Sequence, residues 1–451
     1  MNKIKVNGII PGPRAKEILK KDAMYSSPSY TRVYPLVIKE AKGLWVEDVD
    51  GNIFLDFAAG IAVNSTGHCH PRVVEAIKKQ ADCFLHMSGT DFYYDLMPQV
   101  AEEIIKSINS SQDWKVFFSN SGTEAVEAAM KLARFNTRKQ YFIAFYGAFH
   151  GRTLGSMSLT ASKKSQKVGF GAPFPGALHV PYADCYRCVY NRKLEECSYE
   201  CIQFIKDYVF AKSPGSENIA AIVVEPIQGE GGYIIPPRDF LKKLRDLTLQ
   251  ENMLLIVDEI QSGFGRTGKM FAFQHFDVVP DVICVAKGIA SGLPLGAMIA
   301  KTEYMNWKSG AHASTFGANP LSLAAAKETL DLVKNHYASN AAETGKYMLE
   351  KLKLLEFQSP WVGQVRGLGL MIGIDFVKDK NTKGPHSQLR NELVDDIFRK
   401  GLLVLGCGES TIRLCPPLCV NKEEADIAIN ILTETIMNIE KNVRPMATVT
   451  N

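Results

Sequence analysis

Between about residues 114 and 300, short apolar runs alternate with stretches whose apolar residues recur at helical spacing. The runs contain almost no polar residue, which is typical of strands that are buried on both faces of a parallel sheet. They are Val116–Phe118, Tyr141–Phe145, Ile219–Val224, Leu254–Val257, Val282–Ala286 and Ala297–Ala300. The pattern therefore predicts an α/β domain with a mostly parallel sheet covered by helices.

The pattern changes on both sides of this region. Residues 37–56 alternate apolar and polar positions around an Asp-Gly pair, which predicts a β-hairpin. From Asn319 a long helical pattern leads to strands expected at 371–376 and 411–414. Residues 1 to about 34 are rich in Pro, Gly, Ser and Lys, which favours an arm that wraps around another surface.

These patterns divide the chain into three parts. The first holds the arm and the hairpin, the second is a large α/β domain, and the third is a C-terminal α+β region. The predicted boundaries are 1–75, 76–330 and 331–451.

Composition limits the classes of function. With 451 residues, 46% of them hydrophobic and 22% charged, the chain is long enough for two well-built cores. The net charge of only +4 and the absence of a basic block give no reason to expect nucleic acid or a membrane surface as a partner. Without the apolar segment of a signal peptide or a membrane span, the protein is expected to be cytoplasmic.

Two of the apolar runs end in residues that carry chemistry. Asp258 follows one of them and Lys287 follows the other. Ligands of parallel sheets bind at the carboxyl ends of strands, so the two side chains are expected at one site. An acid and a lysine in this arrangement suit a pyridinium partner and a Schiff-base amine, as pyridoxal phosphate requires. Taken singly, each would more simply be a solvated surface residue.

A loop of small and hydroxyl residues, Ser121-Gly122-Thr123, joins an apolar run to a helical pattern. Backbone N–H groups and the helix dipole at such a start favour a phosphate group. The alternative is an ordinary N-cap, which Ser and Thr also supply. The acid and the lysine elsewhere in the chain favour the phosphate interpretation.

Longer motifs carry a specific resemblance. The blocks SNSGTEA, AFHGRT, VVEPIQGEGG, DEIQSGFGRTG, AKGIASGLPLGA and STFGANP occur in this order. From about residue 35 to 420 the chain resembles the class III, ω-type, pyridoxal phosphate-dependent aminotransferases of fold type I. The resemblance implies a large domain with a mostly parallel seven-stranded sheet and a smaller α+β domain from the N- and C-terminal segments, so that residues 1–75 contribute the arm and part of the small domain and residues 331–451 contribute the rest. It leans toward 4-aminobutyrate aminotransferase-like members, in a subgroup that also contains amino-acid racemases and epimerases.

The resemblance implies roles for individual residues around pyridoxal 5′-phosphate. Lys287 matches the lysine that holds the cofactor and moves the substrate proton, and Asp258 matches the acid that pairs with the ring nitrogen. The other residues in the implied cofactor site are Ser121, Gly122 and Thr123 at the phosphate, Phe149 and Ile260 on the two ring faces, His150, Gln261 near the 3-oxygen, and Thr315 at the phosphate of a neighbouring subunit. Thr315 therefore implies a homodimer with shared active sites, which could assemble further.

The resemblance also implies the substrates, an amino acid and a 2-oxo acid. Arg413 matches an arginine that clamps the α-carboxylate of glutamate, and Glu230 matches an acid that masks this arginine when an ω-amino substrate binds. The alternative for this pair is a structural salt bridge. Ile61 is a further expected pocket residue. The predicted reaction moves an amino group from 4-aminobutyrate or an ornithine-like donor to 2-oxoglutarate. Racemisation or epimerisation of an amino acid is the competing prediction, and it needs a second base that the spacing does not identify.

Four of the ten cysteines form the pattern C-x2-C-x8-C-x3-C. They are Cys185, Cys188, Cys197 and Cys201. The first pair has ligand-like spacing for zinc or an iron–sulfur cluster, whereas the second pair has helical spacing. Free thiols and no bound metal are the favoured interpretation for a chain of this kind.

Overall fold

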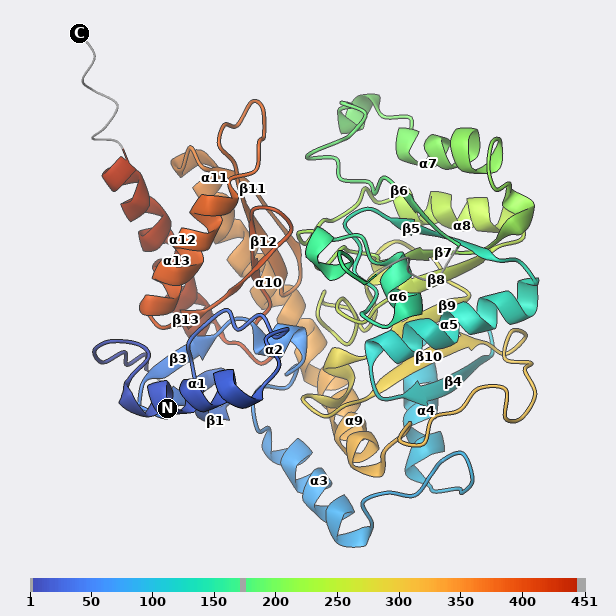
Figure 1. Ribbon diagram of the computed structural model, residues 1–451, viewed down its shortest axis with the longest axis horizontal. Coiled ribbons are helices and arrows are strands. Elements are labelled where there is room, and N and C mark those ends of the chain that lie inside the picture. Colours follow the sequence, from blue (N-terminus) through green and yellow to red (C-terminus); the bar gives the residue numbers. More distant parts are fainter. Residues whose placement is uncertain (1–2, 171–175, 444–451) are drawn as a thin grey trace.

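The computed structural model describes residues 3–170 and 176–443. Figure 1 shows a large domain around a central sheet on the right and a smaller domain on the left. Helices α1 (Pro13–Tyr25) and α13 (Lys422–Val443), near the two ends of the described chain, both lie on the side of the smaller domain. The predicted combination of a large α/β domain with a second, smaller domain is confirmed.

In the described part of the chain, seven strands form the large sheet in the order β4-β10-β9-β8-β7-β5-β6. Strand β10 runs antiparallel to both of its neighbours, and the other pairs are parallel. The bounds are β4 Trp114–Ser119, β5 Tyr141–Phe145, β6 Ala177–Val180, β7 Ile219–Val224, β8 Leu254–Asp258, β9 Val282–Val285 and β10 Gly296–Lys301. The mostly parallel sheet was therefore predicted correctly, although β6 was missed.

Both faces of this sheet are buried, which explains its continuously apolar strands. Ile256 of β8 packs with residues of α5 (Gly122–Thr137) on one face. Its neighbours Leu255 and Val257 belong to the core on the opposite face, with residues of α4, α8 and α9. These helices span Leu96–Ile108, Phe240–Gln250 and Pro320–Leu332.

The small domain combines both ends of the chain. One core cluster contains Leu55 and Phe57 together with Ile372 and Leu432. Its two sheets have the orders β1-β2-β3-β13 and β11-β12-β15-β14. The strands are β1 Ile38–Lys42, β2 Trp45–Asp48, β3 Ile53–Asp56, β11 Val362–Leu368, β12 Met371–Phe376, β13 Leu402–Leu403, β14 Leu405–Cys407 and β15 Thr411–Leu414. The boundaries near residues 75 and 330 stay a prediction.

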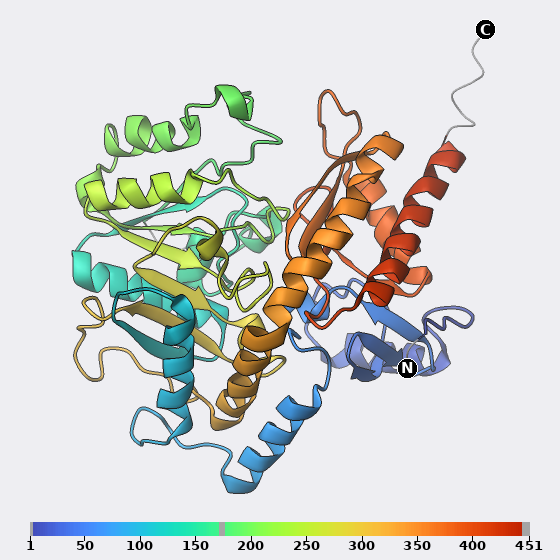
Figure 2. The ribbon, with the colours of Figure 1, turned by 180° about the vertical axis from the view of Figure 1, so that it is seen from behind.

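A long helical run connects the two domains, as the view from behind shows (Figure 2). It consists of α9, a π-helical segment η7 (Val333–Tyr337) and α10 (Ala338–Lys353). Val333 packs in the small-domain core, whereas Leu323 of α9 packs in the large-domain core. This run therefore joins the two domains and is packed into the core of each.

The N-terminal arm is partly helical, because α1 covers Pro13–Tyr25. Proline is well tolerated at the first position of a helix, and most of the following residues are good helix formers. The remaining helical segments are α2 Ala59–Ala62, α3 Pro71–Cys83, α6 Leu154–Leu159, α7 Glu200–Phe204, α11 Leu355–Gln358, α12 Ser387–Arg399, α13 Lys422–Val443, η1 Lys164–Gln166, η2 Leu194–Glu196, η3 Ile205–Phe210, η4 Ser216–Asn218, η5 Ala272–His275 and η6 Lys287–Ala290.

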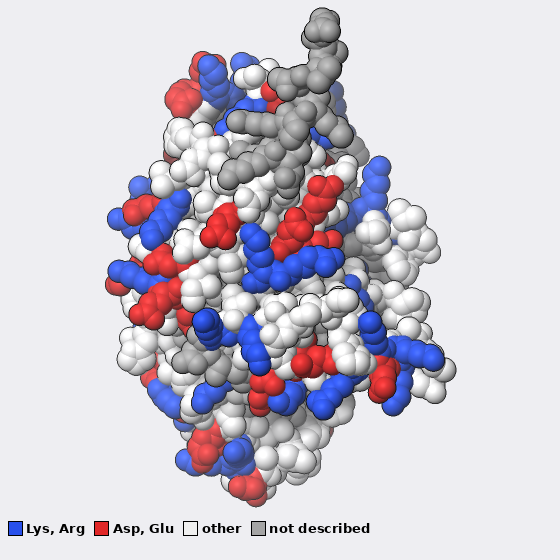
Figure 3. All heavy atoms as spheres, turned by 90° about the vertical axis from the view of Figure 1, so that its left-hand side faces the viewer, with Lys and Arg blue, Asp and Glu red and all other residues white. Residues whose placement is uncertain are grey.

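Charges of both signs are interspersed over the face of the molecule that Figure 3 shows. This face belongs to the side of the small domain in Figure 1. Among the described residues, no helix is both long and apolar enough to span a bilayer.

Candidate active site

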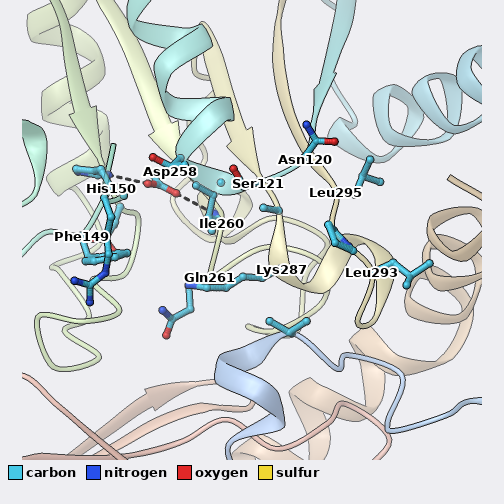
Figure 4. A pocket seen from close by; sticks show the side chains of 18 of the residues that line it. Asn120, Ser121, Phe149, His150, Asp258, Ile260, Gln261, Lys287, Leu293 and Leu295 are labelled. Carbon is cyan, nitrogen blue, oxygen red and sulfur yellow. Dashed lines mark hydrogen bonds and ion pairs between the residues drawn. The ribbon is translucent and has the colours of Figure 1, made fainter. Parts of the chain in front are cut away.

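A cavity of about 440 Å³ lies at the carboxyl ends of the large-sheet strands. Figure 4 shows side chains that surround it. Every predicted cofactor residue except Thr315 lines this one cavity: Ser121, Gly122, Thr123, Phe149, His150, Asp258, Ile260, Gln261 and Lys287. The parallel sheet brings them together because β8 and β9 pair in register, with Asp258 opposite Cys284.

Asp258 is a buried acid that the protein holds at both oxygens. The Ile260 backbone N–H donates to Oδ1 at 3.0 Å, and Nδ1 of His150 donates to Oδ2 at 2.7 Å. Burial opposes a charged imidazole, but the hydrogen bond and charge of Asp258 raise the pKa of His150 above its ordinary value. This arrangement fixes the carboxylate as a hydrogen-bond acceptor at the cavity wall, which suits the partner of a pyridinium nitrogen.

Lys287 follows β9 and has a backbone φ of 43°, in the left-handed region that lysine rarely adopts. Strain of this kind occurs at functional sites, where the surrounding structure enforces it. Burial is the largest cause that lowers the pKa of Lys287, and the charge of Arg413 acts in the same direction. The carboxylate of Glu230 opposes the shift. A lowered pKa favours the neutral amine, which is the nucleophilic form.

The start of α5 forms another wall of the cavity. Ser121 is the N-cap, and its hydroxyl accepts a hydrogen bond from the Glu124 backbone N–H. The Thr123 hydroxyl is bonded to the hydroxyls of Thr153 and Ser156, at 2.8 and 2.5 Å. The capping interpretation therefore holds for the Ser121 side chain. The backbone N–H groups of the first helical turn are the donors that suit a phosphate at this end.

The remaining walls fit a flat ring with a polar edge. Phe149 and Ile260 are apolar walls, and the Oε1 atom of Gln261 is buried without a hydrogen-bond partner in the described residues. Gly122 makes room for Ile260, because a Cβ atom at residue 122 would lie 2.7 Å from its Cδ1. An unpaired buried polar atom is costly unless a ligand satisfies it. The backbone N–H groups at the start of α5, the two apolar walls and the unpaired Oε1 of Gln261 together fit pyridoxal phosphate.

Two charged residues of the cavity were missed from the sequence. Glu225 accepts backbone hydrogen bonds from Phe149 and Gly229, at 3.2 and 3.1 Å. Burial, with the Asp258 charge adding to it and His150 opposing it, raises the pKa of Glu225 to about 7. The sequence contained a signal for Glu225, because it directly follows the apolar strand β7, just as Asp258 stands at the end of β8.

The second missed residue is Arg152, which also lines the cavity. Its guanidinium carbon lies 5.6 Å from the centroid of the Phe149 ring. Within residues 3–170 and 176–443 no acid forms an ion pair with Arg152, so its charge is free to meet an anionic ligand. The block AFHGRT that supplied Phe149 also contains this arginine.

The predicted substrate residues lie beside the cavity and outside the set of residues that line it. Nη1 of Arg413 and Oε1 of Glu230 form an ion pair between the two domains. Both charges act on the pKa of Lys287. Gly229, directly before Glu230, lies against the cavity wall, because a Cβ atom at residue 229 would lie 2.7 Å from Nε2 of Gln261. Ile61 lies in a strained turn with φ 69° and is 43% exposed. Thr315 is exposed and does not face this cavity.

The four clustered cysteines are free thiols in the structure. Burial is the main cause that raises the pKa of Cys185 to about 11 and that of Cys201 to about 12. No group of three or more His, Cys, Asp and Glu side chains in the described parts of the chain is arranged to hold a metal ion.

Comparison with known proteins agrees with this geometry. A family model described as aminotransferase class III matches residues 25–436. An alanine/serine racemase of Pyrococcus horikoshii is 36% identical over 434 residues, which cover 94% of this chain and 91% of the relative. An acetylornithine aminotransferase of Methanocaldococcus jannaschii is 39% identical over 417 residues, covering 90% of this chain and 95% of the relative.

A solved structure extends the comparison to the fold and the cofactor. The ornithine aminotransferase of Toxoplasma gondii, whose active site was found partly occupied by pyridoxal phosphate, superimposes with a TM-score of 0.81 at 29% identity and covers 95% of each chain. The resemblance inferred from the motifs is thereby confirmed. The chain belongs to the class III aminotransferase family, whose cofactor is pyridoxal phosphate.

Proposed function

We propose that this enzyme moves an amino group from an ω-amino acid, ornithine-like or 4-aminobutyrate, to 2-oxoglutarate and so forms glutamate. The observation that carries the proposal is the Glu230–Arg413 ion pair beside Lys287. While Glu230 pairs with Arg413, the two charges compensate each other. A donor whose amine enters this part of the site then meets no uncompensated positive charge. The same arginine, once unmasked, clamps a carboxylate through two hydrogen bonds. Such a pair suits a site that must accept two substrates of different charge in turn.

Arg152 supports a dicarboxylic acceptor. 2-Oxoglutarate carries two carboxylates, so a site that binds it needs two cations. Arg413 provides one beside Lys287, and Arg152 provides a second at the cavity wall without a competing acid. Two of the relatives act on compounds of the ornithine type, according to their names.

Within the proposed reaction, the residues of this chain have separate tasks. When bound, pyridoxal phosphate supplies an electron sink for the carbanion that forms at the substrate carbon. Lys287 Nζ takes the proton from that carbon and returns it, aided by the lowered pKa of its amine. Asp258 keeps a negative charge where the ring nitrogen needs a proton, and His150 holds the carboxylate in place.

Racemisation is the second candidate, since the cavity holds a second acid–base group besides Lys287. A racemase needs two acid–base groups, so that a proton can leave from one side and return from the other. Glu225 lines the same cavity as Lys287, and its pKa is raised to about 7, mainly by burial. The similarity to an alanine/serine racemase favours this alternative as well.

Removing the Arg413 charge tests the substrate assignment. In an Arg413→Gln variant we expect the KM for the 2-oxo acid to rise about 10- to 100-fold, because a charge-assisted hydrogen bond is lost. The rate with the ω-amino donor, followed alone as a single half-reaction, should change far less. The matched control is the double variant Glu230→Gln/Arg413→Gln, which leaves no unpaired acid. Equal losses for both substrates in the double variant would contradict the assignment.

We further propose a homodimer in which Thr315 reaches the neighbouring site. The segments 84–95 and 312–319 lie against each other, with the rings of His86 and Phe316 at 5.1 Å. They present a group of exposed apolar side chains: Phe84, Leu85, Met87, Phe92, Tyr93 and Phe316. Grouped apolar side chains of this kind are typical of a protein–protein interface.

Light scattering tests the dimer. The wild-type mass should be near twice the 49.9 kDa of one chain. Phe316→Asp should shift the mass toward the monomer and weaken cofactor binding, because a charge would be buried in the interface. Phe357→Asp is the matched control, since Phe357 is 87% exposed on α11 of the small domain. A monomeric wild-type enzyme would refute the dimer.

A further inference from the structure

The carboxylate of Glu230 is held by two cations from different parts of the fold. Arg413 on β15 contacts Oε1. Lys163, directly before η1, contacts the other oxygen, with Nζ 3.3 Å from Oε2. Burial opposes ionisation, but the charges of Arg413 and Lys163 keep the pKa of Glu230 below its ordinary value. The motif comparison assigned Glu230 and Arg413 but gave no role to Lys163.

The backbone around Glu230 is fixed, so only its side chain is free to change partner. The Gly408 N–H donates to the Glu230 carbonyl at 2.8 Å. The Arg366 guanidinium donates to the carbonyls of Gly232 and Tyr233. These bonds tie the loop after β7 to the small domain at Glu230 and directly after it. A rotation of the carboxylate is therefore the available movement.

Arg413 has capacity for a second anion. Its side chain is only 5% exposed, and its Nε atom has no hydrogen-bond partner among the described residues. A buried guanidinium with an unsatisfied donor is a ready site for a substrate carboxylate. When that carboxylate binds, Glu230 has to give up part or all of its contact with Arg413.

A displaced Glu230 needs another cation, because its side chain is only 14% exposed. A buried carboxylate without a partner is strongly unfavourable. Lys163 already contacts Oε2, the oxygen that Arg413 does not contact. Its side chain is 42% exposed, so the ammonium can follow the carboxylate at little cost in packing.

We propose that Lys163 is a specificity-determining residue that holds Glu230 whenever a dicarboxylic substrate occupies Arg413. This inference rests on the proposed function. With an ω-amino donor bound, Glu230 has both cations, and Lys163 adds little to the contact with Arg413. With a dicarboxylate bound, Lys163 is the remaining partner of Glu230. Lys163 therefore acts selectively on the dicarboxylate and is a positioning residue, since it acts through Glu230.

The test compares Lys163→Met with Lys163→Arg in the holoenzyme. The Met variant keeps much of the length of the side chain and removes its charge, and the Arg variant restores the charge. The probe is glutarate, a dicarboxylate that cannot accept an amino group, and its equilibrium Kd is measured by calorimetry. Lys164→Met is the matched control, because Lys164 is the adjacent exposed lysine and makes no contact with Glu230.

We expect Lys163→Met to raise both the Kd for glutarate and the KM for the 2-oxo acid about three- to tenfold, the range for a partly exposed ion pair beside a buried acid. The KM for the ω-amino donor should stay within about twofold. Lys163→Arg should restore both dicarboxylate constants, and Lys164→Met should change neither.

Several results would overturn the inference. These are an unchanged Kd for glutarate in Lys163→Met, equal changes for the donor and the dicarboxylate, failure of Lys163→Arg to restore binding, and the same loss in Lys164→Met. Failure of the proposed function has a different signature. The wild-type enzyme would then form no glutamate, whereas binding of glutarate would still report on Lys163.

Discussion

Lys287→Ala is expected to lower kcat by on the order of 10⁴-fold or more, because the variant loses both the covalent attachment of the cofactor and the group that moves the proton. The side chain follows β9 and lines the cavity, and burial lowers the pKa of its amine. The most direct readout is reduction of the holoenzyme with borohydride, followed by mass spectrometry of the peptide that contains residue 287. In the wild type this peptide should carry the mass of the reduced cofactor.

Lys164→Ala is the control for Lys287→Ala, since Lys164 is an exposed lysine outside the cavity. It should keep both the activity and the modified peptide. Cofactor found on another lysine in the wild type, or normal turnover in Lys287→Ala, would show that Lys287 has a different role.

Asp258→Asn should lower kcat by about 10²- to 10⁴-fold, because breaking a buried charge pair costs about 3–5 kcal/mol. The amide cannot supply the charge that keeps the ring nitrogen protonated. In the wild type, Oδ2 of Asp258 lies 2.7 Å from Nδ1 of His150. The amide of the variant would bring no negative charge to this contact. Steady-state kinetics at saturating cofactor would measure the loss.

Asp281→Asn is the matched control. Asp281 is a buried acid of the same sheet, just before β9, where it pairs with Arg245 and Lys301 away from the cavity. Its replacement should lower thermal stability and leave the rate per folded, cofactor-loaded enzyme close to that of the wild type. If Asp258→Asn reduced stability but preserved this rate, the acid would be structural.

The strands of the large sheet were predictable because burial on both faces leaves continuous apolar runs. All six runs named from the sequence are strands in the structure. Strand β6 was missed because its four residues include His179, so the apolar run is broken. Strand β11 was missed for a related reason, since its sequence VGQVRGL mixes glycine, polar and apolar positions.

The positions of Asp258 and Lys287 in the cavity followed from one rule, that strand ends meet at the same edge of a parallel sheet. The same rule applied to β7 would have found Glu225. Contacts between residues far apart in the chain leave no comparable pattern in the sequence. Glu230 and Arg413 are 183 positions apart and came from the family resemblance alone. Lys163 lies 67 positions before Glu230 in a turn without a recognisable motif.

Transfer and racemisation use the same lysine and acid, so one assay has to follow both outcomes. The holoenzyme is incubated with single amino acids, 4-aminobutyrate and ornithine among them, with and without 2-oxoglutarate, and glutamate and optical purity are measured together. The account predicts glutamate from an ω-amino donor only when 2-oxoglutarate is present, with the optical purity of L-amino acids preserved. Loss of optical purity in an L-amino acid, with no glutamate from any donor, would contradict it.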